Sequence, residues 1–225
     1  MRRAILSAVL AAGIFTASCQ QPALAEGAVA TPAAAVQANE SAGKKTAVFA
    51  GGCFWGIEAV FSHLKGVSSV VSGYHGGAKG TAIYDVVGNG RTGHAESVRV
   101  TYDPAQIRYD QLLRVFFAVG ADPTQLNYQG PDHGTQYRNA LVPMNAEQAR
   151  VAAAYLGQLK KSGLWKQPIV TTIEPYKAFY PAEGYHQDFA ANNPDHGYIK
   201  RWDAPKVANL KRMFPDLYKA GFTRN

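Results

Sequence analysis

The spacing of apolar residues along this chain predicts a strand, a tight turn and a helix close to residue 50. Residues 46–50 form an apolar, β-prone run of strand length. The apolar positions that follow recur with the i, i+3, i+4, i+7 spacing of one helix face, at Ile57, Val60, Phe61 and Leu64. We therefore predict a strand over residues 46–50, a helix over residues 54–64, and a strand-to-helix turn that carries Cys53.

The rest of the pattern predicts an α+β fold with two long loops. Further strands are expected over residues 67–73, 96–102, 139–142 and 169–173, and helices over residues 112–117, 146–161 and 207–214. Asn145 is the expected cap of the helix over residues 146–161. This order resembles the split βαβ plan, a two-layer sandwich with a ferredoxin-like core and two helices on one face of the sheet. We expect the sheet to be mixed and the long functional loops, residues 75–93 and 122–137, to cluster near Cys53.

The first part of the chain predicts export. Arg2-Arg3, an apolar run to about Ala17 and the small residues before Glu26 form the pattern of a signal peptide over residues 1–25. Lipidation at Cys19 is the weaker alternative. Residues 26–45 are rich in Ala, Gln and Ser and predict a flexible linker, so the folded domain is expected over residues 46–225. We expect an exported, periplasmic protein.

Charge and composition exclude several classes of function. The formal net charge is +7, but the basic residues are scattered, which favours a solvated surface over a nucleic-acid track. The apolar run at the start is too short for a permanent membrane span. The six histidines lack metal-ligand spacing, so we expect no metal and no cofactor. We expect a monomer.

Cysteine usage points to Cys53. The chain has two cysteines, and both signal-peptide hypotheses remove or block Cys19. Cys53 lies in Gly51-Gly52-Cys53-Phe54-Trp55-Gly56, at or just before the first turn of a helix. Unpaired N–H groups there favour negative charge, so the thiol is expected to ionise more readily. The residues predict a nucleophile beside an aromatic wall; the alternative is a small buried hydrophobic side chain.

The two long loops supply possible partners for a thiolate. Glu96 stands at the start of a strand, Tyr84 lies in the first loop, and Asp132 and Tyr137 lie in the second. Each also has a structural interpretation, as an edge carboxylate or a packed tyrosine. Two other functions stay open at this point. One is a cysteine hydrolase or acyltransferase that uses His94 or His186 as its base. The other is a non-catalytic, exported binding module with an inert thiol.

Four motifs in order resemble one known family. They are Gly52-Cys-Phe-Trp-Gly56, Gly93-His-Ala-Glu96, Asp132-His-Gly-Thr-Gln-Tyr-Arg138 and Gly184-Tyr-His-Gln187. From about Ala47 to His196 the chain resembles the type A peptide-methionine (S)-S-oxide reductases. The resemblance implies thiol-dependent reduction of the S epimer of methionine sulfoxide, free or in proteins, and a role in the repair of oxidised proteins.

The resemblance also implies a role for each site residue. Cys53 would be the nucleophile, Glu96 the acid, Tyr84 and Tyr137 donors to the sulfoxide oxygen, Asp132 a support for the network, Phe54 and Trp55 the methyl cage, and His186 a substrate contact. The physical chemistry agrees, because desolvation keeps a buried carboxylic acid protonated near neutral pH. After attack on the sulfoxide sulfur, the nucleophile would be left as a sulfenic acid.

The sequence departs from many members of this family at one position. Ile199 stands where they carry a first resolving cysteine, and no cysteine follows it. An internal disulfide therefore cannot form at that place. We expect an external thiol to complete the cycle, either a thioredoxin-like protein or a small thiol.

Overall fold

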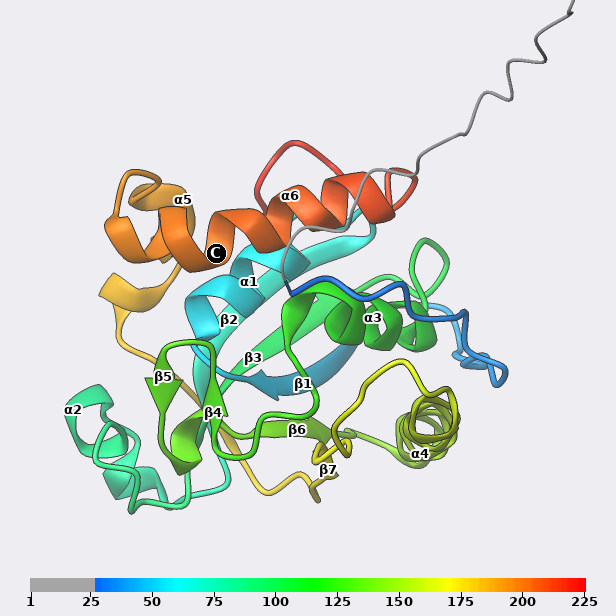
Figure 1. The fold of residues 1–225 in the computed structure, drawn as a ribbon. Helices are drawn as coiled ribbons and strands as arrows, with labels where there is room; N and C mark the ends of the chain where they lie inside the picture. The colour runs from blue at the N-terminus through cyan, green and yellow to red at the C-terminus, as the bar shows by residue number, and fades with distance from the viewer. Residues whose placement is uncertain (1–26) are drawn as a thin grey trace, which may run out of the picture.

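The computed structural model describes residues 27–225 (Figure 1). The predicted signal peptide, with Ala25 and Cys19, lies outside the described residues. No helix in the described part is both long enough and apolar enough to cross a membrane.

A six-stranded mixed sheet forms the centre of the fold, with strand order β7-β6-β1-β3-β2-β8. Its strands are β1 (Lys45–Gly51), β2 (Val67–His75), β3 (Ala95–Tyr102), β6 (Asn139–Val142), β7 (Thr172–Ile173) and β8 (Phe179–Pro181). All neighbours are antiparallel except β6 and β7, which are parallel. The four inner strands β6-β1-β3-β2 have the order of a ferredoxin-like sheet, so the predicted split βαβ core and mixed sheet are confirmed.

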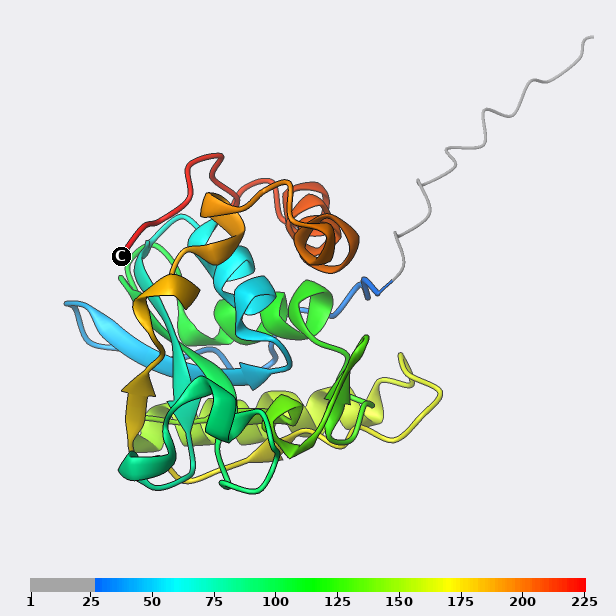
Figure 2. The ribbon, with the colours of Figure 1, turned by 90° about the vertical axis from the view of Figure 1, so that its left-hand side faces the viewer.

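The helices lie mainly on one side of this sheet (Figure 2). The α-helices are α1 (Phe54–Ser62), α2 (Tyr84–Val87), α3 (Tyr109–Val115), α4 (Ala146–Lys161), α5 (Phe189–Asn192) and α6 (Ala204–Met213). The 3-10 turns are η1 (Lys79–Thr81), η3 (Thr135–Tyr137) and η4 (Gly184–His186), and two π-helical turns are η2 (Phe116–Gly120) and η5 (Ile199–Asp203). The side chain of Asn145 accepts the Gln148 N–H, so the predicted cap of α4 is confirmed.

Aromatic packing joins β1 to α1 and to the end of α3. The ring of Phe49, on β1, lies 4.8 Å from that of Phe61 on α1 and 5.4 Å from that of Phe116 on η2, centroid to centroid. All three side chains are fully buried. Such packing holds the end of β1 and the start of α1 in a fixed relation, and this is where Cys53 lies.

Several boundaries differ from the prediction. The strand expected over residues 169–173 is limited to β7, and β8, α5 and the small hairpin of β4 (Tyr128–Gln129) and β5 (Asp132–His133) were not expected. These elements have two to four residues, too few to show a hydrophobic period. The pairing that defines them comes from distant parts of the chain.

Residues 27–44, here called the N-terminal arm, pack along α3 and α4. The Ala38 N–H donates to Asp110 Oδ1 at 3.0 Å, and the Asn39 N–H donates to Glu147 Oε1 at 2.7 Å. Ala28 and Ala38 are buried in the main core. The predicted flexible linker is therefore wrong for the part of it that the structure describes.

The reason is that small apolar residues can be buried without a regular period. The arm's backbone finds partners on helices that follow it by more than sixty residues, as Ala38 does in α3. The composition of the arm predicts only a small contribution to the hydrophobic core. It carries no information about hydrogen bonds between the arm's backbone and distant helices.

Candidate active site

Cys53 caps the N-terminus of α1, directly after β1. Gly52 provides the turn, with φ +88°, and a Cβ atom there would come within 2.4 Å of Gln129 Cβ. Glycine is therefore required at this position both by its backbone conformation and by space. Cys53 is half-buried. Its position between β1 and α1 confirms the predicted strand-to-helix turn.

Glu96 holds its carboxyl group beside this turn. It lies on β3 between β1 and β2, so it is a central-strand residue and not the edge carboxylate of the structural interpretation. Its Oε2 atom accepts the N–H of Phe54, the neighbour of Cys53, at 3.1 Å. Burial and, to a smaller extent, the charge of Asp132 raise the pKa of Glu96 to about 8, although the Phe54 N–H opposes the shift. The expectation of a protonated acid at neutral pH is consistent with this environment.

Tyr84, Tyr137 and Asp132 converge on the same place from three separate elements, α2, η3 and β5. Burial, together with the charges of Glu96, Cys53 and Asp132, raises the pKa of Tyr84 to about 12. Burial also raises the pKa of Tyr137, and so do the same three groups. These mutual influences show that the structure brings the five predicted polar site residues together.

The aromatic side chains form a cluster around His186. The Phe54 ring is buried and lies 5.1 Å from the His186 ring and 6.3 Å from the Tyr84 ring. Trp55 is only partly buried and stacks on Phe189, with 3.8 Å between centroids and 8° between planes. An apolar wall therefore borders the thiol, as predicted, with Phe54 at its base and Trp55 nearer to solvent.

The histidines are engaged in contacts other than with the thiol. Trp55 Nε1 can only donate, and it lies 3.2 Å from His186 Nδ1, so neutral His186 carries its proton on Nε2. His94 Nδ1 accepts the Gly77 N–H at 3.2 Å, and its Nε2 atom lies 3.0 Å from the Ala78 carbonyl oxygen. Within residues 27–225, neither ring makes a hydrogen bond to Cys53. The geometry disfavours a thiol–histidine hydrolase.

The electrostatics of the thiol contradict one expectation. Burial raises the pKa of Cys53 well above its ordinary value, and the nearby charges of Glu96 and Asp203 raise it further. The Trp55 N–H at the start of the helix lowers it, as the sequence predicted, but this contribution is smaller. The prediction that the thiol ionises more readily is therefore wrong. A local N–H effect is outweighed by carboxylates that come from distant parts of the chain.

Two residues at the site escaped the sequence analysis. The Tyr198 hydroxyl donates to Asp132 Oδ2, and the Tyr198 ring lies edge-on to Trp55 at 5.8 Å. Asp203 is fully buried against the first turn of α1. Asp203 opens the sequence Asp203-Ala-Pro, which is typical of a helix start. That local signal does not reveal which other helix the Asp203 side chain contacts.

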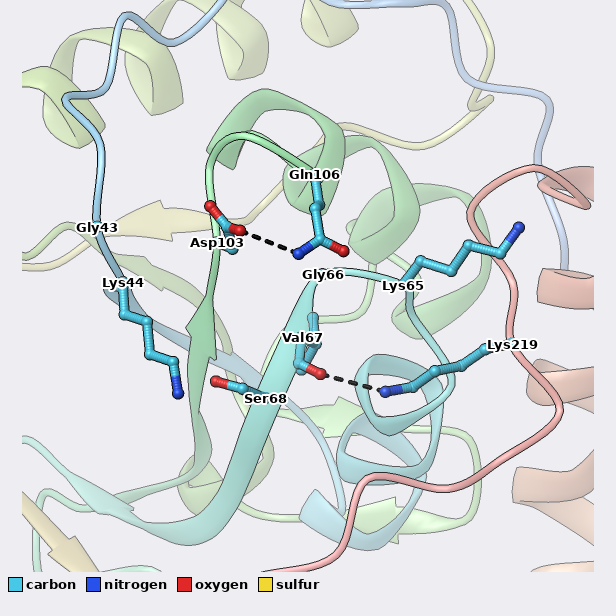
Figure 3. Close-up of a pocket in the computed structure, with 9 residues that line it drawn as sticks. All are labelled: Gly43, Lys44, Lys65, Gly66, Val67, Ser68, Asp103, Gln106 and Lys219. Carbon is cyan, nitrogen blue, oxygen red and sulfur yellow. Dashed lines mark hydrogen bonds between the residues drawn. The ribbon is translucent and has the colours of Figure 1, made fainter.

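A surface cavity of about 550 Å³ lies at the other end of the sheet (Figure 3). It is lined by residues at the start of β2 and just after β3, whereas Cys53 follows the end of β1. Its polar groups bond to one another, with Gln106 Nε2 donating to Asp103 and Lys219 Nζ donating to the Val67 carbonyl. None of the predicted site residues lines this cavity. In the described part of the chain, no cluster of three or more His, Cys, Asp or Glu side chains could hold a metal ion.

Comparison with known proteins identifies the family. A family model described as peptide methionine sulfoxide reductase matches residues 45–217. A peptide methionine sulfoxide reductase MsrA 2 of Mesorhizobium japonicum is 60% identical over 176 residues, which cover 78% of this chain and 90% of that protein. A peptide methionine sulfoxide reductase MsrA of Deinococcus radiodurans is 51% identical over 175 residues, with 78% of this chain and 84% of that protein covered.

Solved structures agree with this assignment. The reduced form of Mxr1 from Saccharomyces cerevisiae has a TM-score of 0.58 and 32% identity, and the match covers 72% of this chain and 91% of that one. Methionine sulfoxide reductase A of Corynebacterium diphtheriae has a TM-score of 0.57 and 35% identity, with 68% and 76% covered. The chain belongs to the MsrA family of peptide methionine sulfoxide reductases.

Proposed function

We propose that Cys53 attacks the sulfur of S-methionine sulfoxide while Glu96 delivers a proton to the oxygen. The observation that supports this assignment is the buried Glu96 carboxyl, bonded to the N–H next to Cys53 and with its pKa raised to about 8. A sulfoxide oxygen leaves poorly unless it is protonated or hydrogen-bonded. An acid that keeps its proton at neutral pH, beside a nucleophile, meets that requirement.

Tyr84 and Tyr137 are the proposed donors to the sulfoxide oxygen. Their pKa values are raised above the ordinary value of a tyrosine, so both phenols keep their protons at neutral and mildly alkaline pH. Asp132 accepts the hydroxyl of Tyr198 and is thereby held in place. Phe54 and Trp55 provide the apolar contact for the methyl group.

The products follow from electron balance. The sulfur of the substrate gains two electrons and leaves as methionine, and Cys53 loses two and retains the oxygen as a sulfenic acid. An external thiol then attacks Cys53 Sγ and water leaves, which gives a mixed disulfide that a second thiol breaks. We propose a thioredoxin-like protein or a small thiol in this role, because Cys53 is the sole cysteine in residues 27–225.

The periplasm, reached by export, is the proposed location of this reaction. The pattern of residues 1–25 supports it. Terminal sequencing of the protein recovered from cell fractions tests it. A protein retained in the cytoplasm with its first residues intact would contradict the proposal.

Separated S and R sulfoxides of a blocked methionine, with dithiothreitol as reductant, test the proposed activity. The S epimer should be reduced and the R epimer should react little, because the methyl contact and the oxygen donors lie in a fixed chiral arrangement. Cys53→Ser serves as the control without a nucleophile. Equal rates on both epimers, or full activity of Cys53→Ser, would contradict the assignment.

A further inference from the structure

Gly56 marks the point at which the C-terminal part of the chain contacts the catalytic helix. Gly56 lies in the first turn of α1, three residues after Cys53. A Cβ atom at this position would come within 2.2 Å of Asp203 Oδ1 and within 2.9 Å of Lys206 Nζ. Glycine is therefore needed here for close approach, and the two side chains that approach carry opposite charges.

Asp203 is a buried carboxylate that the proposed reaction does not use. Its side chain is 1% exposed, and Lys206 Nζ lies 3.6 Å from its Oδ1 atom. In the described part of the chain, neither carboxylate oxygen makes a hydrogen bond that meets the ordinary geometric limits. A buried charge that is held by one cation and by no hydrogen bond is costly to maintain, so packing alone does not account for Asp203.

Titratable groups from several separate elements lie near Cys53. Glu96 on β3, Asp132 on β5 and Asp203 at the end of η5 are the carboxyl groups that influence it, and Tyr84 on α2, Tyr137 on η3 and Tyr198 just before η5 are the phenols that it influences. His133 and Lys206 face Asp132, and His186 on η4 contacts the rings of Phe54 and Trp55. The acids are in excess. Among the cations, Lys206 lowers the pKa of both Asp132 and Asp203, each of which is raised chiefly by burial.

Asp203 acts on the thiol directly, whereas Lys206 acts on the carboxylates beside it. The negative charge of Asp203 disfavours a thiolate at Cys53. Burial raises the pKa of Asp203 to about 6, so the carboxyl is ionised under ordinary assay conditions. Lys206 offsets Asp203 and Asp132 and is itself only partly exposed, so solvent screens it incompletely.

We propose that Asp203 and Lys206 are positioning residues, a charge pair docked on Gly56 that sets how readily Cys53 forms its thiolate. Asp203 restrains the nucleophile in the resting enzyme, and Lys206 limits that restraint. The role assigned to the thiol rests on the proposed function, but the effect of the pair on ionisation does not depend on turnover.

Alkylation of Cys53 by iodoacetamide, followed across a wide pH range, tests the pair without any sulfoxide. Asp203→Asn removes the opposing charge and should speed alkylation, by about threefold or more below the thiol pKa, because half a pKa unit is about a threefold change in thiolate. Lys206→Gln should slow alkylation by a similar factor. The double variant should return toward the wild-type rate.

Matched variants separate charge from structure. Lys206→Arg keeps the charge and should retain the wild-type rate. Lys200→Gln removes a nearby exposed lysine, which pairs with the exposed Asp195, and should change nothing. Each variant is checked for its fold by circular dichroism.

Alkylation rates that change in opposite directions in Asp203→Asn and Lys206→Gln support the proposed role of the charge pair, because loss of packing would move both rates in the same direction. Shifts of the same sign, or no shift in either variant, would overturn the proposal. Failure of the epimer assay alone would instead overturn the assigned reaction and leave this result standing.

Discussion

Glu96→Gln is the substitution that most sharply separates proton delivery from packing. The amide keeps the shape of the side chain and an oxygen that can accept the Phe54 N–H, which donates to Glu96 at 3.1 Å in the wild-type protein. With a pKa of about 8, the wild-type acid is protonated in about nine of ten molecules at neutral pH. Gln cannot deliver that proton. General acids contribute about 10²–10⁴-fold, so we expect a loss of that size in the rate of methionine formation.

The pH dependence gives a second, more specific test. The thiol pKa of Cys53 lies above that of Glu96, so the pair loses its first proton chiefly from the acid. The reactive form has a protonated acid and a thiolate, and it holds the same number of protons as the commoner form with a carboxylate and a thiol. Its share is therefore greatest after the pair has lost one proton and before it loses the second.

Rapid-quench single turnovers at low substrate concentration measure this profile. The wild-type rate should rise toward about pH 8 and fall again where the second proton is lost. Glu96→Gln has no acid to deprotonate, so its rate should rise with the thiolate and then stay level. A variant rate within about threefold of wild type, or a falling limb in the variant, would refute the role given to Glu96.

Two further substitutions test the packing around the site and the N-terminal arm. Gly56→Ala should gain about 1 kcal/mol in helix propensity. Thermal unfolding should nevertheless show a net destabilisation of about 1–3 kcal/mol, because the new methyl group overlaps the buried Asp203. An unchanged or higher melting temperature would contradict that contact. Glu40 accepts hydrogen bonds from the Tyr109 N–H, at 3.0 Å, and from the Tyr102 hydroxyl. In urea unfolding, Glu40→Ala should lower the free energy of unfolding by about 2–4 kcal/mol and Glu40→Gln by clearly less. Equal losses in the two variants would show that the hydrogen bonds are not responsible.

Much of the framework could be predicted because its signals are local. The period of α1, the Asn145 cap of α4 and the glycine turn at Gly52 each depend on residues within a few positions of one another. The order of these elements was enough to infer the split βαβ core. The acid role of Glu96 could be argued from chemistry once the family resemblance placed it near a thiol.

The parts that could not be predicted depend on distant residues. The direction of the Cys53 pKa is set by burial and by carboxylates from β3 and η5, and neither is visible in the sequence around the thiol. The N-terminal arm is ordered by partners such as Asp110, which lies 72 positions beyond Ala38. Burial and long-range pairing are properties of the folded chain, so a local pattern indicates them only when a family resemblance supplies the missing context.

The most direct test of the central claim is the intact mass of the protein after one turnover without reductant. With excess S-sulfoxide, we expect about one methionine released per chain and a sulfenic acid on Cys53 that adds dimedone once. A Cys19→Ser variant should behave in the same way, because Cys19 has no part in the cycle. A loss of two hydrogens with no dimedone adduct would mean that an internal disulfide has formed, and the mechanism with a single cysteine would be wrong.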